Sequence, residues 1–139
     1  MFDPDCAFCA IVAGTAPATT VLEEEDCVAF LDVRPLFAGH VLLVPREHHV
    51  TLADLPRELV EPLFTAAQRL CRAVEGALEA HGTFVAVNNV VSQSVPHLHV
   101  HVVPRRRKDG LRGFFWPRTR YAPGQAEEVA ARVRAALAA

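Results

Sequence analysis

The stretch that decides the fold is residues 92–104, Ser-Gln-Ser-Val-Pro-His-Leu-His-Val-His-Val-Val-Pro. From His97 onward, histidine alternates strictly with an aliphatic residue. Successive side chains of a β-strand point to opposite faces, so the three histidines should share one face and Leu98, Val100 and Val102 the other. We therefore predict a half-buried strand whose apolar side lies in a core and whose open side carries three imidazoles.

Three interpretations of this strand compete. The first is a strand with ordinary surface histidines. This interpretation is the least favoured, because three histidines lie in register. The second is a catalytic metal held by two or three imidazoles. The third is covalent catalysis with the central histidine, His99, as the nucleophile. Imidazole is partly unprotonated near neutral pH, so it can attack phosphorus without a separate base.

Length and composition narrow the class of protein. The chain has 139 residues, of which 51% are hydrophobic, and a formal net charge of −2. This length suits one domain with a sizeable core, and the charge argues against wholesale nucleic-acid binding. The longest aliphatic run, residues 41–44, is too short to span a bilayer. We expect no signal peptide, since no basic region followed by an apolar region opens the sequence. We therefore expect a cytoplasmic protein with reduced cysteines.

Three blocks of the sequence resemble the histidine-triad (HIT) superfamily. Residues 97–103 resemble its His-x-His-x-His signature with apolar neighbours, and residues 93–95, Gln-Ser-Val, match the usual lead-in. Residues 6–14 and 30–48 resemble two further blocks in the family order. The resemblance covers about residues 6–104. It implies an α+β fold, with an antiparallel five-stranded sheet, one long helix, short terminal helices, and the helices against one face.

Local patterns place the other elements of a single domain over residues 1–139. A long helix is expected at 54–81, where apolar residues recur at i, i+3 and i+4, with Asp54 as N-cap and Gly82 as the stop. Pro62 inside it should kink the first turns or delay the start to about residue 61. The remaining expected elements are a short helix at 5–13 ended by Gly14, strands at 19–23, 27–33, 38–45 and 83–88, and a C-terminal helix at 125–138.

The resemblance implies roles for the triad and its neighbours. His99 would be the nucleophile and form a nucleotidyl-histidine intermediate that water resolves. His101 and His40 would contact phosphate oxygens, and Ser94 would assist the leaving group. Asp32 would accept hydrogen bonds from the ribose hydroxyls. The other residues implied in nucleotide or phosphate binding are Asn88 and Gln93, with Phe8, Ile11 and Phe30 around the base; ordinary core packing is the alternative for the last three.

The connection at residues 88–92, Asn-Asn-Val-Val-Ser, departs from the family pattern. The usual connection is longer and has Gly before the Gln, where this chain has Ser92. The loop over the α-phosphate should therefore be tighter or differently shaped, which puts the role of Asn88 in question.

Cys6-x-x-Cys9 is ambiguous by itself. It fits a redox pair, half of a zinc site, or two buried cysteines without a role. The resemblance to the zinc-bearing branch of the superfamily adds His48 and His97 and completes a Cys2His2 set. A structural Zn²⁺ there would fix the start of the catalytic strand. A divalent cation that accompanies the substrate phosphates is a second candidate cofactor.

The stretch at 105–124 is basic and aromatic, with seven Arg or Lys and four aromatic residues between positions 105 and 121. One interpretation is a solvated surface loop. The other is a cover that meets the distal, anionic part of the substrate, with arginines on phosphate and Trp116 on a second base.

The third triad position, His101, bears on the reaction. The transferase branch of the superfamily carries Gln there, so the resemblance favours a hydrolase of dinucleoside polyphosphates or nucleoside phosphoramidates. The expected substrate is a purine nucleotide or dinucleotide, and the expected partner is a second copy in a homodimer. A nucleotidyltransferase of the same superfamily and a nucleotide-binding module with weak catalysis are the alternatives.

Overall fold

The computed structural model describes residues 2–111 and 118–139, in two compact units, Met1–Asp109 and Gly110–Ala139. In its described part the second unit holds one helix, α3 (Gln125–Ala138), at the predicted position. A single domain over residues 1–139 stays a prediction. Among the described residues, no helix has the length and hydrophobicity needed to cross a bilayer.

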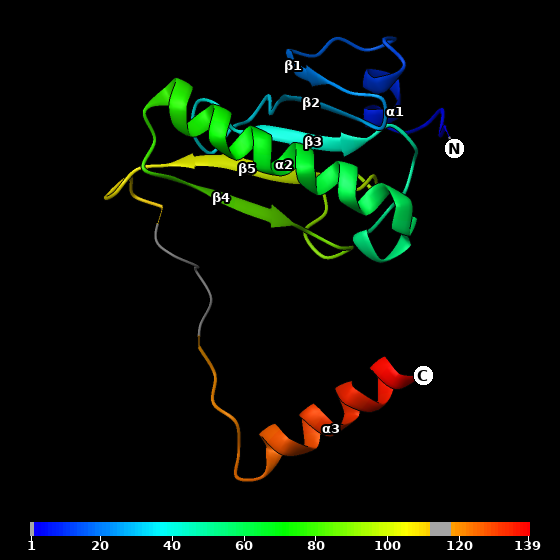
Figure 1. The fold of residues 1–139 in the computed structure, drawn as a ribbon, viewed down its shortest axis with the longest axis vertical. Helices are drawn as coiled ribbons and strands as arrows, with labels where there is room; N and C mark the ends of the chain where they lie inside the picture. Colours follow the sequence, from blue (N-terminus) through cyan, green and yellow to red (C-terminus); the bar gives the residue numbers. More distant parts are fainter. Residues whose placement is uncertain (1, 112–117) are drawn as a thin grey trace. The chain divides into compact units, whose positions relative to one another are not determined.

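The first unit is built on a five-stranded antiparallel sheet (Figure 1). Its spatial order is β1-β2-β3-β5-β4, so the last strand in sequence pairs between β3 and β4. The bounds are β1 Thr20–Glu23, β2 Cys27–Leu31, β3 Val41–Pro45, β4 Gly82–Val87 and β5 Val100–Arg105. The predicted α+β fold with five antiparallel strands is confirmed.

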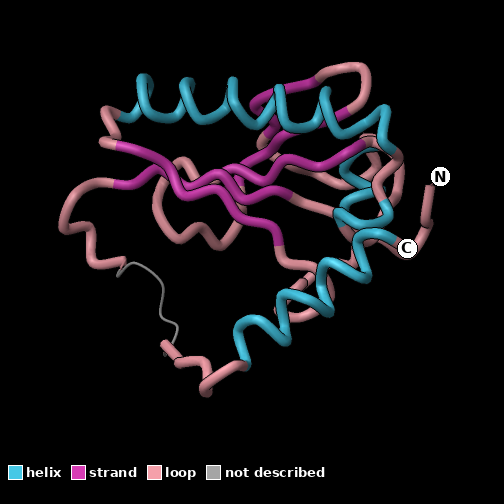
Figure 2. The backbone as a smooth tube through the Cα atoms, turned by 60° about the horizontal axis from the view of Figure 1, so that its bottom comes forward, coloured by secondary structure: helices cyan, strands magenta, loops and turns pink. Residues whose placement is uncertain are grey.

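Helices cover both faces of this sheet. The long helix α2 (Arg57–Leu78) lies along one face (Figure 2) and packs its apolar stripe on Ala29, Leu43, Val100 and Val102. The short helix α1 (Ala7–Val12) packs on the other face, in a second core cluster with the side chains of Val28, Phe30, Leu42 and Val44. The expectation that the helices lie against one face is therefore wrong. Strands β2 and β3 are continuously apolar because both of their faces are buried.

The histidine run differs from its predicted geometry at its start. Strand β5 begins at Val100, so His97 and His99 precede it in irregular backbone. Both are buried, at 0% and 3% exposure, rather than on an open face. The apolar side of the prediction is confirmed, since Leu98, Val100 and Val102 all lie in the α2 core. Pairing with β3 and β4 extends only from Val100 onward, and that pairing decides where a strand begins.

The predicted ends of the long helix are also wrong. Asp54 lies in a short 3-10 turn, where its carboxylate accepts hydrogen bonds from the Thr51 N–H and hydroxyl and so does not cap α2. The helix begins at Arg57, so Pro62 does not delay its start. It ends at Leu78 with Glu79 in the left-handed region, and Gly82 begins β4. The Arg106 guanidinium donates to the carbonyl of Leu78 and satisfies part of that helix end.

Candidate functional site

A cavity of about 450 Å³ lies on the face of the sheet that carries α1. It brings together seven of the predicted residues, from three separate segments of the chain. These are Phe8, Ile11, Phe30, Asp32, Ser94, His99 and His101. Its apolar walls and its polar groups therefore lie in one space, as a ligand site requires.

The other predicted residues lie elsewhere. His40 is buried behind His101, to which it is hydrogen-bonded. Asn88 and Gln93 do not line the cavity, and the Gln93 carboxamide bonds to the main chain instead. Trp116 lies outside the described residues. The sequence did not point to seven further lining residues. One of them is Arg34, and the other six have small or apolar side chains, which give no sign of a binding role: Pro17, Ala18, Leu31, Val33, Leu42 and Val95.

The protonation pattern of His99 follows from one hydrogen bond. Its Nδ1 lies 2.8 Å from the main-chain carbonyl oxygen of His97, which can only accept, so Nδ1 carries the proton. Nε2 of the neutral ring therefore keeps its lone pair, on a side chain that lines the cavity. The edge of the Phe8 ring packs against the imidazole, with centroids 5.1 Å apart, and confines it. An unprotonated ring nitrogen held in place is what a nucleophilic histidine needs.

A second chain of hydrogen bonds fixes His40 and His101. The Leu36 N–H donates to His40 Nδ1 at 3.0 Å, so the proton of the neutral His40 ring lies on Nε2. His40 Nε2 then donates to His101 Nδ1 at 2.9 Å, which puts the His101 proton on its own Nε2. The cavity thus pairs an acceptor, His99 Nε2, with a donor, His101 Nε2–H.

Burial keeps the rings of His40 and His101 neutral. Burial, with smaller contributions from His99 and His40, lowers the pKa of His101 to about 4. Burial also lowers the pKa of His40, against the opposing effect of the Asp32 carboxylate, which lies 3.7 Å from His40 Nε2. The donor at His101 is therefore a neutral imidazole across the physiological pH range.

These contacts disfavour the triad as the ligand set of a catalytic metal. His97 turns its Nδ1 to Cys6 and Cys9, outside the cavity group. Asp32, His40 and His101 do form a compact cluster, with ligand atoms within 4.8 Å of one another. The amide of Leu36, however, makes His40 Nε2 a donor, so this nitrogen has no lone pair to offer a cation.

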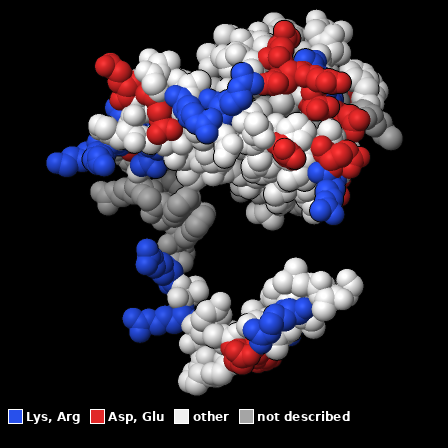
Figure 3. All heavy atoms as spheres, viewed as in Figure 1, with Lys and Arg blue, Asp and Glu red and all other residues white. Residues whose placement is uncertain are grey.

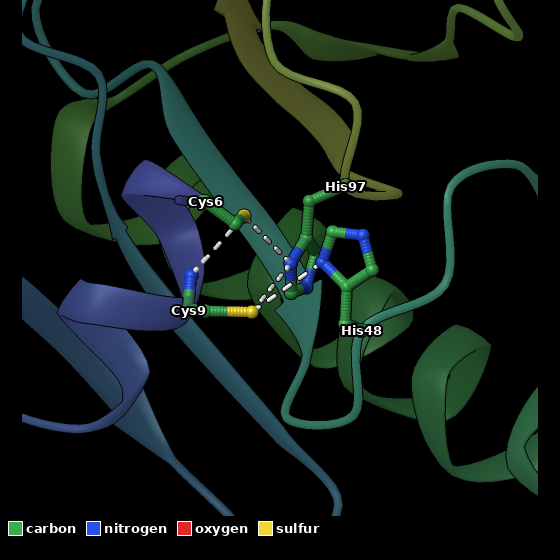
Figure 4. A group of neighbouring side chains, drawn as sticks. All are labelled: Cys6, Cys9, His48 and His97. Carbon is green, nitrogen blue, oxygen red and sulfur yellow. Dashed lines mark hydrogen bonds between the residues drawn. The ribbon is translucent and has the colours of Figure 1, made fainter. Parts of the chain in front are cut away.

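A separate group, Cys6, Cys9, His48 and His97, can hold a metal ion (Figure 4). His97 Nδ1 lies 3.4 Å from Cys6 Sγ and 3.6 Å from Cys9 Sγ, and His48 Nδ1 lies 3.4 Å from Cys9 Sγ. Tetrahedral zinc with ordinary Zn–S and Zn–N bonds would set each such S···N distance at about 3.6 Å. The donor set and its spacing therefore fit zinc, as the resemblance to the zinc-bearing branch implied.

Surrounding groups prepare these atoms for a cation. His97 Nε2 donates to the Pro45 carbonyl oxygen at 2.9 Å, which leaves the lone pair on Nδ1, toward the cysteines. The Asp3 N–H donates to Cys9 Sγ, and the Cys9 N–H to Cys6 Sγ, both at 3.4 Å. Burial raises the pKa of the Cys9 thiol, so a bound cation is what would hold a thiolate there at neutral pH.

Fold and site together define a histidine-triad type of protein, and comparisons with known proteins agree. A family model described as HIT domain matches residues 13–108. An uncharacterised HIT-like protein of Mycobacterium tuberculosis is 41% identical over 108 residues, which cover 76% of this chain and 75% of that protein. An adenosine 5'-monophosphoramidase of Saccharomyces cerevisiae is 33% identical over 110 residues, covering 78% and 68%.

Among solved structures, a zinc-bound histidine triad family protein from Mycobacterium smegmatis is similar, with 42% identity and a TM-score of 0.73. The match covers 96% of this chain and 94% of that one. The chain belongs to the HIT domain family.

The metal group predicts a measurable dependence of stability on zinc. Purified protein should contain about one zinc per chain, and Cys6→Ser should lose it and melt at a lower temperature, because bound metal stabilises only the folded state. Cys71→Ser is the matched control, since Cys71 is a free thiol outside the group. Metal analysis and thermal unfolding before and after chelation are the measurements. A metal-free wild type that melts unchanged would refute the site.

The lowered pKa of His101 predicts a loss of stability in acid. Between pH values of about 6.5 and 4 the unfolded chain protonates His101 while the folded chain does not, so the free energy of unfolding falls as pH falls. The decline from pH 7.5 to 5.0 should therefore be smaller in His101→Gln than in the wild type. Urea unfolding at both pH values, with equal added zinc, measures this, and identical declines would contradict it.

Proposed function

We propose that this protein is a hydrolase that cleaves at the α-phosphate of a nucleoside 5'-phosphoanhydride or phosphoramidate, through a nucleotidyl-His99 intermediate. The observation that carries the proposal is that His99, with its Nδ1 at the His97 carbonyl oxygen, and His101, with its Nδ1 at His40 Nε2, line one cavity. The similarity to a monophosphoramidase supports the reaction class.

In the proposed reaction His99 Nε2 attacks phosphorus, and the bond to the leaving group breaks on the opposite side. The His101 N–H stabilises charge on the phosphate oxygens, and His40 holds the His101 ring in the donating tautomer. Ser94 lines the cavity, and its hydroxyl assists the leaving group. Water then attacks the phosphorus and releases His99.

The same cavity suits a nucleoside. Asp32 begins the turn after β2 and lines the cavity, where its carboxylate can accept from the ribose hydroxyls. Phe8, Ile11 and Phe30 form an apolar wall for a base, which we propose to be a purine. Trp116 is proposed, from the sequence alone, to stack on the second base of a dinucleotide. A divalent cation accompanying the phosphates belongs to the same proposal.

The zinc proposed at the Cys2His2 group is structural. Zinc there would fix the His97 ring, and the main-chain carbonyl of the same residue holds His99. A cytoplasmic location is part of the proposal, because Cys6 and Cys9 bind a metal only when reduced. Two alternatives differ from the proposed hydrolase. A nucleotidyltransferase would pass the nucleotidyl group to an acceptor other than water, and a weakly catalytic binding module would show little turnover.

The nucleophile assignment predicts that His99→Gly lowers turnover on the order of 10⁴-fold, the scale found for essential catalytic groups. Free imidazole should partly restore turnover in this variant, because the vacated space lies against the cavity. The wild type, quenched in acid during turnover, should carry a mass increment of one nucleotidyl group. His49→Gly, outside the cavity, serves as the control. Near-wild-type activity in His99→Gly would exclude the mechanism.

We also propose a homodimer through α2 and the edge strand β4. Val60, Phe64 and Val85 are 38%, 36% and 43% exposed and line one groove there. In the sheet that the described residues form, β4 is the outermost strand beside β5. Phe64→Glu should halve the mass measured by light scattering. Val21→Glu, on the opposite edge strand, should leave it unchanged, and a wild-type monomer would contradict the proposal.

A further inference from the structure

The connection between β4 and the histidine run is strained. Val90 has φ +69° and Ser92 φ +63°, in the left-handed region. The Val91 N–H donates to the Asn89 carbonyl at 2.8 Å, which closes a three-residue turn centred on Val90. A three-residue turn with positive φ at its centre is rare, and a β-branched residue there is a true outlier. Such a conformation persists only where its surroundings impose it.

The side chain of Gln93 supplies that restraint. Its Oε1 accepts from the Val90 N–H at 3.1 Å, and its Nε2 donates to the Val50 carbonyl at 2.6 Å. One carboxamide thus ties the strained residue to the segment at 50–52. Asn89 adds a second tie, since its Oδ1 accepts from the Leu52 N–H at 2.9 Å.

The chain continues directly from this restraint into the cavity. Gln93 is absent from the cavity lining, whereas the next residue, Ser94, is part of it. We propose that Gln93 is a positioning residue: its carboxamide holds the strained 89–92 turn against residues 50–52 and thereby places the Ser94 hydroxyl in the cavity. This inference rests on the proposed function, and it gives Gln93 a role other than direct contact with phosphate.

The chemistry of the two bonds explains why an amide is needed. The Val90 N–H requires an acceptor and the Val50 carbonyl requires a donor, and a carboxamide offers both at one end of a side chain. A carboxylate offers only acceptors until it is protonated. Glu at position 93 should therefore restore the restraint only in acid.

The strain itself is tested by two glycine variants. Val90→Gly should raise the melting temperature by roughly 3–5 °C, because glycine adopts positive φ without penalty. Val91→Gly, at a similarly exposed neighbour with no positive φ, should lower it, because glycine chiefly raises the entropy of the unfolded chain. A lower melting temperature in Val90→Gly would show that no strain is stored there and overturn the first step.

The restraint is tested by Gln93→Ala and Gln93→Glu. Gln93→Ala should lose hydrogen-exchange protection at the Val90 amide and lower kcat on the order of 10²-fold, the scale for a reacting group displaced by about 1 Å. The dissociation constant for AMP should stay within about twofold, because the walls at Phe8, Phe30 and Asp32 remain intact. Relative to the wild type, Gln93→Glu should recover activity as pH falls from 7 to 5.

Opposite results would overturn the inference. Weakened AMP binding with unchanged exchange at Val90 would mean that Gln93 contacts the phosphate itself. Unchanged kcat in Gln93→Ala would mean that Ser94 is placed without it. If His99→Gly shows the proposed hydrolysis to be wrong, exchange and melting still report on the restraint, so the two failures are distinguishable.

Discussion

The structure depends most on one buried residue, His97, whose polar atoms serve two sites at once. Its ring joins the cysteines on one side and the Pro45 carbonyl on the other. Its main-chain carbonyl accepts from the ring of His99. A fully buried imidazole is costly unless both nitrogens have partners. Throughout residues 2–111 and 118–139, no buried side-chain nitrogen or oxygen lacks one. A change at the cysteine group can therefore reach His99, the proposed nucleophile, through His97.

The two faces of the sheet differ in the side chains that they carry. The face under α2 is filled by aliphatic side chains, and the face under α1 carries the cavity and the metal group. Phe8 links the cavity with the metal group on the face under α1. It lies between Cys6 and Cys9 in sequence, and its ring packs on both His97 and His99. On the side drawn in Figure 3, acidic side chains gather mainly at the right of the first unit, and basic side chains lie mainly at its left and centre.

Much of the fold and site could be predicted because their signals are local. Alternation in the histidine run identified the core residues Leu98, Val100 and Val102. The three histidines and the two cysteines could be identified as candidate site residues from their residue types and spacing. The misses depend on partners distant in sequence: β5 starts where β3 and β4 pair with it, and Gln93 turns from the cavity because Val50 offers a carbonyl. Asp54 failed as a cap because Thr51 competes for its carboxylate.

The hydrogen bond from Leu36 to His40 has a consequence for how the chain can drift in evolution. The group that sets the tautomers of His40 and His101 is a main-chain N–H, which every residue except proline possesses. Leu36 is 52% exposed, and its side chain takes no part in that bond. The side chain at position 36 can therefore vary widely while His40 and His101 keep the same tautomers. Selection there acts on backbone shape and on the exclusion of one amino acid.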